Sequence, residues 1–242
     1  MRRAKDKQLG GTTQYYATPH WATHRLLDAI DLPRGGHWVE LGFGAGAIVR
    51  AVASYEQGGE RPYQGCHWSL FEIDPVIARV GVARINQSLP ELRSFEVVMG
   101  DVLTGADIVR VRAGGLADVA IFNPPNDLAG EFIVEALKVA NVACCFQPLQ
   151  IYAGEEREQL FSAHRPSRVL VLPNRPRFRG QGSPMQTYAW FIFDRRRPTE
   201  TRLDRLALTN LSVRKADFAR QSAEDLEDFG PPDTGHAHGV HQ

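Results

Sequence analysis

Short apolar runs separated by amphipathic segments recur along most of the chain, and this alternation limits the fold more than any other feature. Short apolar runs predict buried strands, and apolar residues at helical spacing predict helices. Strands that alternate with helices are typical of a mainly parallel sheet with helices on both faces. Strands are expected at residues 37–42, 67–73, 95–100, 118–123, 142–147, 168–173 and 186–194. Helices are expected at residues 47–55, 75–89, 128–140 and 153–163.

The loop between the last two expected strands indicates how the sheet ends. Residues 174–184 are enough for a hairpin but too few for a crossover helix. The seventh strand should therefore run antiparallel to its neighbours. The expected fold class is α/β, with a seven-stranded, doubly wound, mostly parallel sheet and an antiparallel last strand.

The composition is that of one globular domain, with 242 residues of which 43% are hydrophobic and 23% charged. We expect a flexible N-terminus at 1–14, a folded domain at 15–200, an extension at 201–225 and a disordered tail at 226–242. No apolar run reaches the roughly 18 residues of a membrane helix, and the basic start lacks the apolar stretch of a signal peptide. We therefore expect no membrane partner and a cytoplasmic location. The sequence does not indicate an oligomeric state.

Two of the three cysteines, Cys144 and Cys145, are neighbours inside an apolar run. This placement favours reduced strand residues over a disulfide or a metal site. The histidines near the C-terminus fit a flexible polar tail better than a metal site, so no metal is expected.

The charge is distributed unevenly although the formal net charge is zero. Residues 165–197 carry eight arginines and one acid, which is compatible with a polyanionic partner such as a nucleic acid. Within this stretch, a surface that contacts phosphates and bases is predicted from the loop residues Arg175, Arg177, Phe178 and Arg179. The alternative is a solvated charged loop.

A glycine-rich segment follows the first expected strand and opens a helix, where a doubly wound sheet binds nucleotide-like ligands. It reads Glu40-Leu-Gly42-Phe-Gly44-Ala-Gly46. Gly42, Gly44 and Ala47 also match the spacing of a dinucleotide-binding turn, and a third reading is a glycine turn needed only for packing. The motif alone leaves these alternatives open.

Residues after the next three expected strands narrow the choice. Glu72 ends the second strand, beside Ile73, and can accept hydrogen bonds from ribose hydroxyls. Asp101 follows the third strand, beside Val102, and can accept from an adenine amine. The fourth strand ends in Asn123-Pro124-Pro125-Asn126, a turn for which a dehydrogenase has no use. Together these residues favour S-adenosylmethionine over NAD.

With these motifs the chain resembles the S-adenosylmethionine-dependent DNA N6-adenine methyltransferases, particularly the compact kind of phages and prophages. The resemblance covers about residues 15–195, including the segment Tyr16 to Trp21, the motifs above and the late stretch Arg177 to Phe191. It implies a Rossmann-like class I methyltransferase domain over 15–200, with S-adenosylmethionine as cofactor and DNA as partner. It also implies that Tyr16, Thr18, Pro19 and the glycine loop hold the methionine part of the cofactor.

The proposed chemistry explains why an Asn-Pro-Pro turn is suitable. An aromatic amine is a poor nucleophile because its lone pair is conjugated into the ring. The Asn123 amide oxygen and the Pro124 carbonyl would accept its two hydrogens and direct the lone pair at the methyl group, which is catalysis by positioning and electrostatics. Pro124 and Pro125 would restrict the turn so that both acceptors face the pocket.

One residue departs from the family pattern. The family has an aromatic residue after Pro-Pro that stacks on the target base, a contact worth roughly 1–3 kcal/mol, but here the position is Asn126. Phe122 or Trp190 could supply a replacement stacking surface, but each fits a core position better. Asn-Pro-Pro turns also serve methyltransferases of RNA base amines and of protein glutamine, so an enzyme for another planar nitrogen is one alternative. The departure at Asn126 leaves a second, a catalytically weak, cofactor-binding protein that binds nucleic acid.

Overall fold

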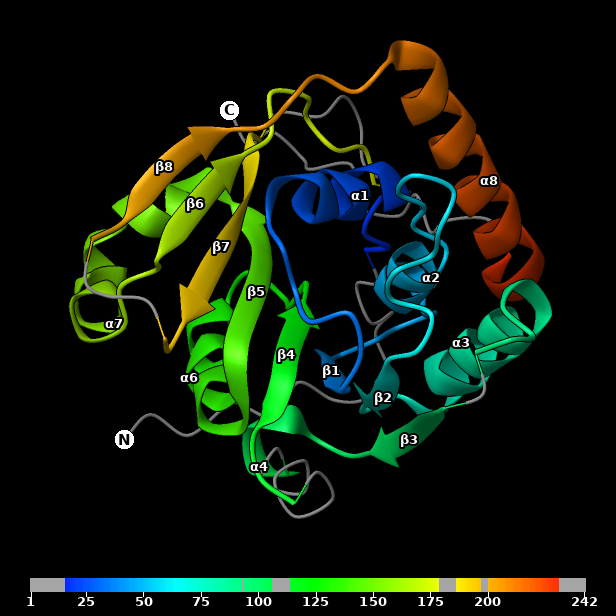
Figure 1. Ribbon diagram of the computed structural model, residues 1–242, viewed down its shortest axis with the longest axis horizontal. Coiled ribbons are helices and arrows are strands. Elements are labelled where there is room, and N and C mark those ends of the chain that lie inside the picture. The colour runs from blue at the N-terminus through cyan, green and yellow to red at the C-terminus, as the bar shows by residue number, and fades with distance from the viewer. Residues whose placement is uncertain (1–15, 93, 106–113, 179–185, 197–199, 231–242) are drawn as a thin grey trace, which may run out of the picture.

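The structure, a computed structural model, describes residues 16–92, 94–105, 114–178, 186–196 and 200–230. A central eight-stranded sheet has the strand order β3-β2-β1-β4-β5-β7-β6-β8 (Figure 1). Its strands are β1 His37–Leu41, β2 His67–Glu72, β3 Phe95–Met99, β4 Ala117–Phe122, β5 Ala140–Pro148, β6 Arg168–Val171, β7 Tyr188–Asp194 and β8 Arg202–Arg205. The helices are α1 His20–Ala29, α2 Ala47–Ala53, α3 Pro75–Ser88, α4 Val102–Gly105, α6 Ala129–Val139, α7 Glu158–Ala163 and α8 Leu211–Phe229, with 3₁₀ turns η1 Leu149–Ala153 and η2 Glu155–Arg157.

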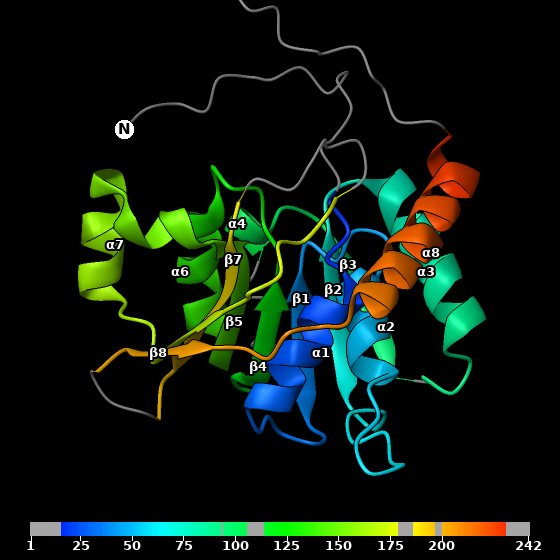
Figure 2. The same cartoon turned by 90° about the horizontal axis from the view of Figure 1, so that it is seen from above.

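Helices cover both faces of the sheet, as the alternation of segments predicts. On one face α1, α2 and α3 pack over Trp38, Trp68 and Trp190, which are fully buried. On the other face α6 and α7 pack over Phe122 and Phe191. Figure 2 shows these two helical layers on opposite sides of the strands. The core is therefore a three-layer α/β arrangement in which the strand ends remain accessible.

The order and direction of the first seven strands confirm the expected fold class. β1 to β5 are parallel to one another, whereas β7 is antiparallel to both β5 and β6. The expected number of strands was wrong, because an eighth strand, β8, pairs in parallel with β6. Its sequence, Arg-Leu-Asp-Arg, has too little apolar character to predict a strand, and the open edge of β6 supplies its backbone partners.

The C-terminal region also differs from the expected boundaries. Within the expected extension at 201–225, residues 202–205 join the sheet as β8 and residues 211–225 form most of α8. Residues 226–229, expected to belong to a disordered tail, are helical because α8 continues to Phe229. The expectations for residues 1–14 and for the end of the chain beyond 230 lie outside the described residues.

Two observations bear on the expectations drawn from the composition. No helix among the described residues is long and apolar enough to cross a membrane. The three cysteines have free thiols and are buried, and Cys144 and Cys145 lie in β5. Burial raises the pKa of the Cys66 thiol to about 12, so this thiol is unreactive at neutral pH.

Candidate functional site

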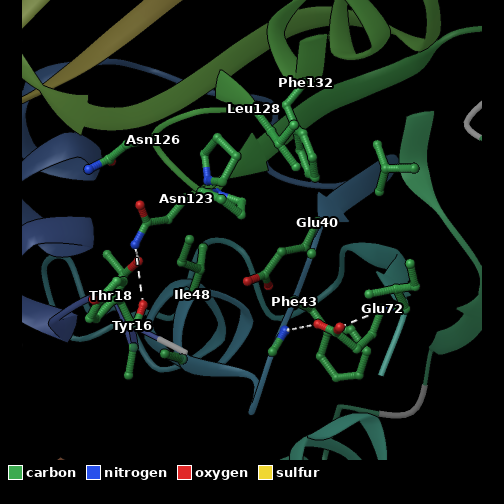
Figure 3. A pocket seen from close by; sticks show the side chains of 18 of the residues that line it. Tyr16, Thr18, Glu40, Phe43, Ile48, Glu72, Asn123, Asn126, Leu128 and Phe132 are labelled. Carbon is green, nitrogen blue, oxygen red and sulfur yellow. Dashed lines mark hydrogen bonds between the residues drawn. The ribbon is translucent and has the colours of Figure 1, made fainter. Parts of the chain in front are cut away.

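A pocket of about 530 Å³ opens at the carboxyl ends of β1 to β4, where a doubly wound sheet is expected to bind its ligand. Figure 3 shows side chains from the glycine loop, the ends of β2 and β4, and the segment before α1 facing one another across it. Among the residues predicted from the sequence, the pocket brings together Tyr16, Thr18, Glu40, Gly42, Gly44, Glu72, Ile73, Asp101, Val102, Asn123, Pro124, Pro125, Asn126 and Phe178.

The glycine loop has the backbone conformation that only glycine adopts easily. Gly42, Gly44 and Gly46 have φ angles of 76°, 55° and 76°. A second glycine requirement comes from Gly81 in α3, where an added Cβ would lie 2.6 Å from the Gly44 carbonyl oxygen. α3 therefore approaches the loop closely enough to fix its path. Sequence reasoning missed Gly81, because an isolated glycine in a helix gives only a weak signal.

Glu40 lies below the loop with its carboxyl group buried. One of its oxygens accepts a hydrogen bond from the Val49 backbone nitrogen at 3.0 Å, which ties β1 to the start of α2. Burial raises the pKa of Glu40 well above its usual value, although the Val49 hydrogen bond opposes the shift and the nearby charge of Glu72 adds to it. Glu40 is thus a desolvated carboxyl group that faces the pocket (Figure 3).

Glu72 connects the glycine loop to the end of β2. Its Oε2 accepts from the Gly44 nitrogen at 2.9 Å, and its Oε1 accepts from the nitrogens of Ile73 at 2.9 Å and Asp74 at 3.0 Å. A carboxylate offers about four acceptor sites, so three of them are already used. Hydrogen bonds from two ribose hydroxyls would therefore require one of these backbone contacts to give way, which the sequence did not predict.

Asp101 forms the far rim of the pocket. Its Oδ1 accepts from the Leu103 nitrogen at 2.9 Å and so caps the short helix α4. Within the described residues no group donates to Oδ2, which leaves this oxygen as an acceptor for a ligand. On the neighbouring rim Ile73 exposes 60% of its surface, and it presents an apolar face beside the same opening.

Asn123 is oriented by the segment before α1. Its Nδ2 donates to the Thr18 hydroxyl at 2.9 Å and to the Tyr16 carbonyl oxygen at 3.3 Å. A carbonyl can only accept, so the amide nitrogen must face this segment and the amide oxygen must point the other way. Figure 3 shows that oxygen directed away from Thr18 and Tyr16. In the part of the chain that the structure describes, no donor occupies it.

Pro124 is held by a residue that sequence reasoning missed. Its carbonyl oxygen accepts from Nε2 of Gln147 at 2.8 Å. Gln147 lies near the end of β5 and is fully buried, and its Oε1 has no partner among the described residues. Because a carbonyl has two lone pairs, Pro124 keeps one acceptor site. The signal in the sequence was a polar residue at the end of an otherwise apolar run.

Asn126 is exposed on the pocket edge, and its backbone carbonyl accepts from Nη2 of Arg157 at 3.0 Å. Phe122 and Trp190 are core residues, the reading that the sequence favoured over a replacement stacking surface, because both side chains are completely buried.

Other rings, from Tyr16, Phe178 and Tyr188, line the pocket instead. Tyr16 and Phe178 have centroids 5.6 Å apart, and those of Phe178 and Tyr188 are 5.3 Å apart.

Of the residues predicted to contact phosphates and bases, Phe178 is only 4% exposed and belongs to the pocket wall, whereas Arg175 and Arg177 do not line the pocket. Arg175 and Arg177 are exposed, and the Arg177 guanidinium lies 4.5 Å from the centre of the Phe218 ring in α8. Arg179 lies outside the described residues. Pro19 and Gly46 do not line the pocket.

Pro19 and Gly46 stand at the starts of helices. Pro19 is the N-cap of α1, and Gly46 is the N-cap of α2. A Cβ at Gly46 would lie 3.1 Å from the Ile85 side chain, so this glycine is needed for close helix packing.

No protein-family model and no curated protein sequence matches the chain. Several solved structures share its architecture, among them a candidate RNA methyltransferase from Pyrococcus horikoshii, with 16% identity and a TM-score of 0.53 over 78% of this chain and 93% of that one. The chain has the class I methyltransferase fold. A candidate class I S-adenosylmethionine-dependent methyltransferase from Listeria monocytogenes is 14% identical, with a TM-score of 0.54 over 86% of this chain and 68% of that one.

A third structure of this fold belongs to a type I restriction-modification system. The methyltransferase subunit from Streptococcus thermophilus is 12% identical, with a TM-score of 0.60 over 86% of this chain and 53% of that one. The present chain thus spans about half the length of that subunit. At these identities the likeness concerns the fold, and the chemistry has to be argued from the pocket itself.

Proposed function

We propose that the protein binds S-adenosylmethionine in this pocket and methylates the N6 amine of adenine in DNA. The observation that carries the proposal is the orientation of Asn123, whose amide oxygen is directed away from the segment that holds its nitrogen. An acceptor fixed in this way, next to the Pro124 carbonyl, suits a planar amine with two hydrogens to donate.

The residues around the pocket fit the three parts of the cofactor. Asp101 has an acceptor oxygen for the adenine amine, and Ile73 offers an apolar surface beside it. Glu72 lies where the ribose would be held, and it has one acceptor site left on Oε2. The methionine part would lie against the glycine loop, near Glu40 and Thr18. When bound, the cofactor supplies an electrophilic methyl group on sulfur.

The substrate side of the pocket is aromatic. The rings of Tyr16, Phe178 and Tyr188 provide flat apolar surface near the Asn-Pro-Pro turn, which favours an aromatic amine over the amide of a glutamine side chain. Asn123 Oδ1 and Pro124 O would each accept one N–H of this amine. Transfer of the methyl group would leave a positive charge on this nitrogen, which the two acceptor oxygens would stabilise. The nitrogen then loses one proton to water.

The exposed arginines beside the pocket favour a nucleic acid as substrate, and the family resemblance points to DNA. Arg175 and Arg177 precede the buried Phe178 and can contact phosphates from the outside while the ring faces the pocket. Asn126 favours a second candidate, another planar amine such as that of an RNA base, because the position lacks the ring that would hold a flipped DNA base. Asn126 is also the residue that supports the other alternative, a catalytically weak protein that binds the cofactor and nucleic acid.

The test combines a labelled methyl group with a variant of the turn. Wild-type protein is incubated with methyl-labelled cofactor and separate pools of DNA, RNA and protein, and the expected result is label in adenine of DNA. Asn123→Ala should lower turnover on the order of 10²-fold while cofactor affinity measured by calorimetry stays the same. The matched control is Asn141→Ala, because Asn141 Nδ2 bonds to the Ala117 carbonyl at the opposite end of the sheet.

The possible results separate the proposals. Unchanged turnover in Asn123→Ala would mean that the turn is only structural. Label in RNA or protein alone would reject DNA as the substrate and keep the chemistry. Tight binding of NAD without binding of S-adenosylmethionine would reject the whole assignment.

A further inference from the structure

The C-terminal helix α8 faces the rest of the domain with polar side chains. Its buried residues are Asp217, Gln221 and Asp225, which recur at every fourth position and so form one stripe along the helix. Two of its leucines, Leu211 and Leu226, each expose 55% of their surface. This is the reverse of an ordinary amphipathic helix, whose apolar stripe faces the core. The inward stripe therefore calls for an explanation in terms of specific contacts.

Two residues of this stripe hold the segment that orients Asn123. Gln221 donates from Nε2 to the Thr18 carbonyl oxygen at 3.0 Å, and Asp217 accepts from the Trp21 backbone nitrogen at 3.3 Å. The N-cap of α1 is a proline without a capping side chain, so Asp217 satisfies an N–H that this helix leaves open. Thr18 is 2% exposed, and its carbonyl needs such a partner.

Thr18 connects α8 to the Asn-Pro-Pro turn, because it bonds to residues of both. Its carbonyl is held by Gln221, while its hydroxyl accepts from Nδ2 of Asn123 at 2.9 Å. Three segments that are far apart in the sequence are thereby joined through one residue. A shift of Thr18 would move the hydroxyl and allow the Asn123 amide to rotate.

Ion pairs keep α8 in the position from which it acts. Arg50 in α2 binds Glu224 at 2.7 Å, and Arg84 in α3 binds Asp225 at 3.0 Å. Both arginines are almost completely buried, so these pairs are shielded from solvent far better than surface pairs. α2 directly follows the glycine loop, so α8 is fixed to the cofactor side of the pocket as well as to Thr18. Figure 1 shows α8 lying along the outside of α2 and α3.

We propose that Gln221 is a positioning residue, which fixes the direction of the Asn123 amide oxygen through Thr18 although it does not line the pocket. The inference rests on the function proposed above. It predicts that loss of the Gln221 donor lowers turnover without lowering cofactor affinity. It also predicts that the effect acts only through Asn123.

The first experiment is a double-mutant cycle. Gln221→Met removes the donor at similar size, and Lys215→Met places the same residue at an exposed position of the same helix as a control. Gln221→Met should lower kcat on the order of tenfold, with the cofactor Kd unchanged. In an Asn123→Ala background the same substitution should have no further effect on kcat. Equal losses in both backgrounds would overturn the inference, because a general structural defect is additive.

The second experiment does not depend on activity. The side-chain amide signals of Asn123 in a ¹⁵N-labelled protein are assigned by their disappearance in Asn123→Ala. Gln221→Met should shift or broaden these signals, and Lys215→Met should leave them unchanged. Unchanged signals in Gln221→Met would overturn the inference even in an active enzyme. If Gln221→Met does not fold, Gln221→Leu is a second variant that removes the donor without burying a charge.

Methyl transfer and the Asn123 amide signals test the proposed function and the positioning role of Gln221 separately. Absence of methyl transfer by the wild type to every pool rejects the proposed function, and the amide signals still test the contact. Methyl transfer by the wild type together with full activity of Gln221→Met rejects the positioning role alone.

Discussion

Glu224 offers a test of how α8 is attached, because its carboxylate forms ion pairs with three arginines, Arg50, Arg84 and Arg220. Its carboxylate accepts from Arg50 at 2.9 and 2.7 Å and from Arg220 at 2.9 Å. Burial alone would raise its pKa. The hydrogen bond from Arg50 and the charges of Arg50 and Arg220 outweigh burial and lower the pKa of Glu224 from 4.5 to about 2. We predict that Glu224→Gln destabilises the protein at neutral pH and that the loss diminishes in acid.

The magnitude follows from the difference between the folded and unfolded states. One pKa unit corresponds to about 1.4 kcal/mol, so a lowering of this size contributes roughly 3 kcal/mol to the free energy of unfolding at neutral pH. The folded-state pKa lies below the unfolded one. The contribution is therefore complete above the unfolded-state pKa and is lost as the pH falls from 4.5 towards 2.

Urea unfolding followed by circular dichroism measures this effect. Glu224→Gln should lower the free energy of unfolding by roughly 3 kcal/mol at neutral pH. The difference in this free energy between wild type and variant should be smaller at about pH 3.5, by on the order of 1 kcal/mol. Glu227→Gln, an exposed carboxylate on the same helix, serves as the control and should have little effect. The reasoning would be refuted if Glu224→Gln had the same free energy of unfolding as the wild type. It would also be refuted if the difference between them stayed the same from neutral pH into acid.

Three further predictions concern the pocket. Gly81→Ala would place a Cβ 2.5 Å from the Phe43 ring and 2.6 Å from the Gly44 carbonyl oxygen. Thermal melting should therefore show a loss of roughly 1–3 kcal/mol in the free energy of unfolding, and calorimetry should show weaker cofactor binding. Wild-type values for both would mean that the loop can shift freely. Glu72→Ala removes the anchor of the loop and should weaken cofactor binding at least about tenfold by calorimetry, whereas an unchanged Kd would argue against its place at the ribose. Asn126→Tyr should lower the KM for adenine-containing DNA, on the order of tenfold, by restoring a stacking surface; a loss of activity beside robust methylation of another substrate would favour that substrate.

The architecture and the place of the site followed from local patterns in the sequence. Apolar runs and helical spacing depend on which residues are neighbours in the chain, so they predicted seven strands and an antiparallel seventh. Residues at the carboxyl ends of parallel strands meet at one edge of the sheet, and this rule brought Glu40, Glu72, Asp101 and Asn123 to a single pocket. Local patterns failed at β8, which forms because β6 offers a free edge.

Sequence alone thus determined seven strands of the sheet, the pocket and the polar groups at the strand ends, because each depends on the order of residues along the chain. Only the tertiary structure decided how these groups are held. Gln147 reaches Pro124 from a neighbouring strand, Gly81 makes room for the glycine loop, and Gln221 reaches Thr18 across about 200 residues of sequence. Such contacts depend on packing distances between distant segments, and no spacing along the chain encodes them.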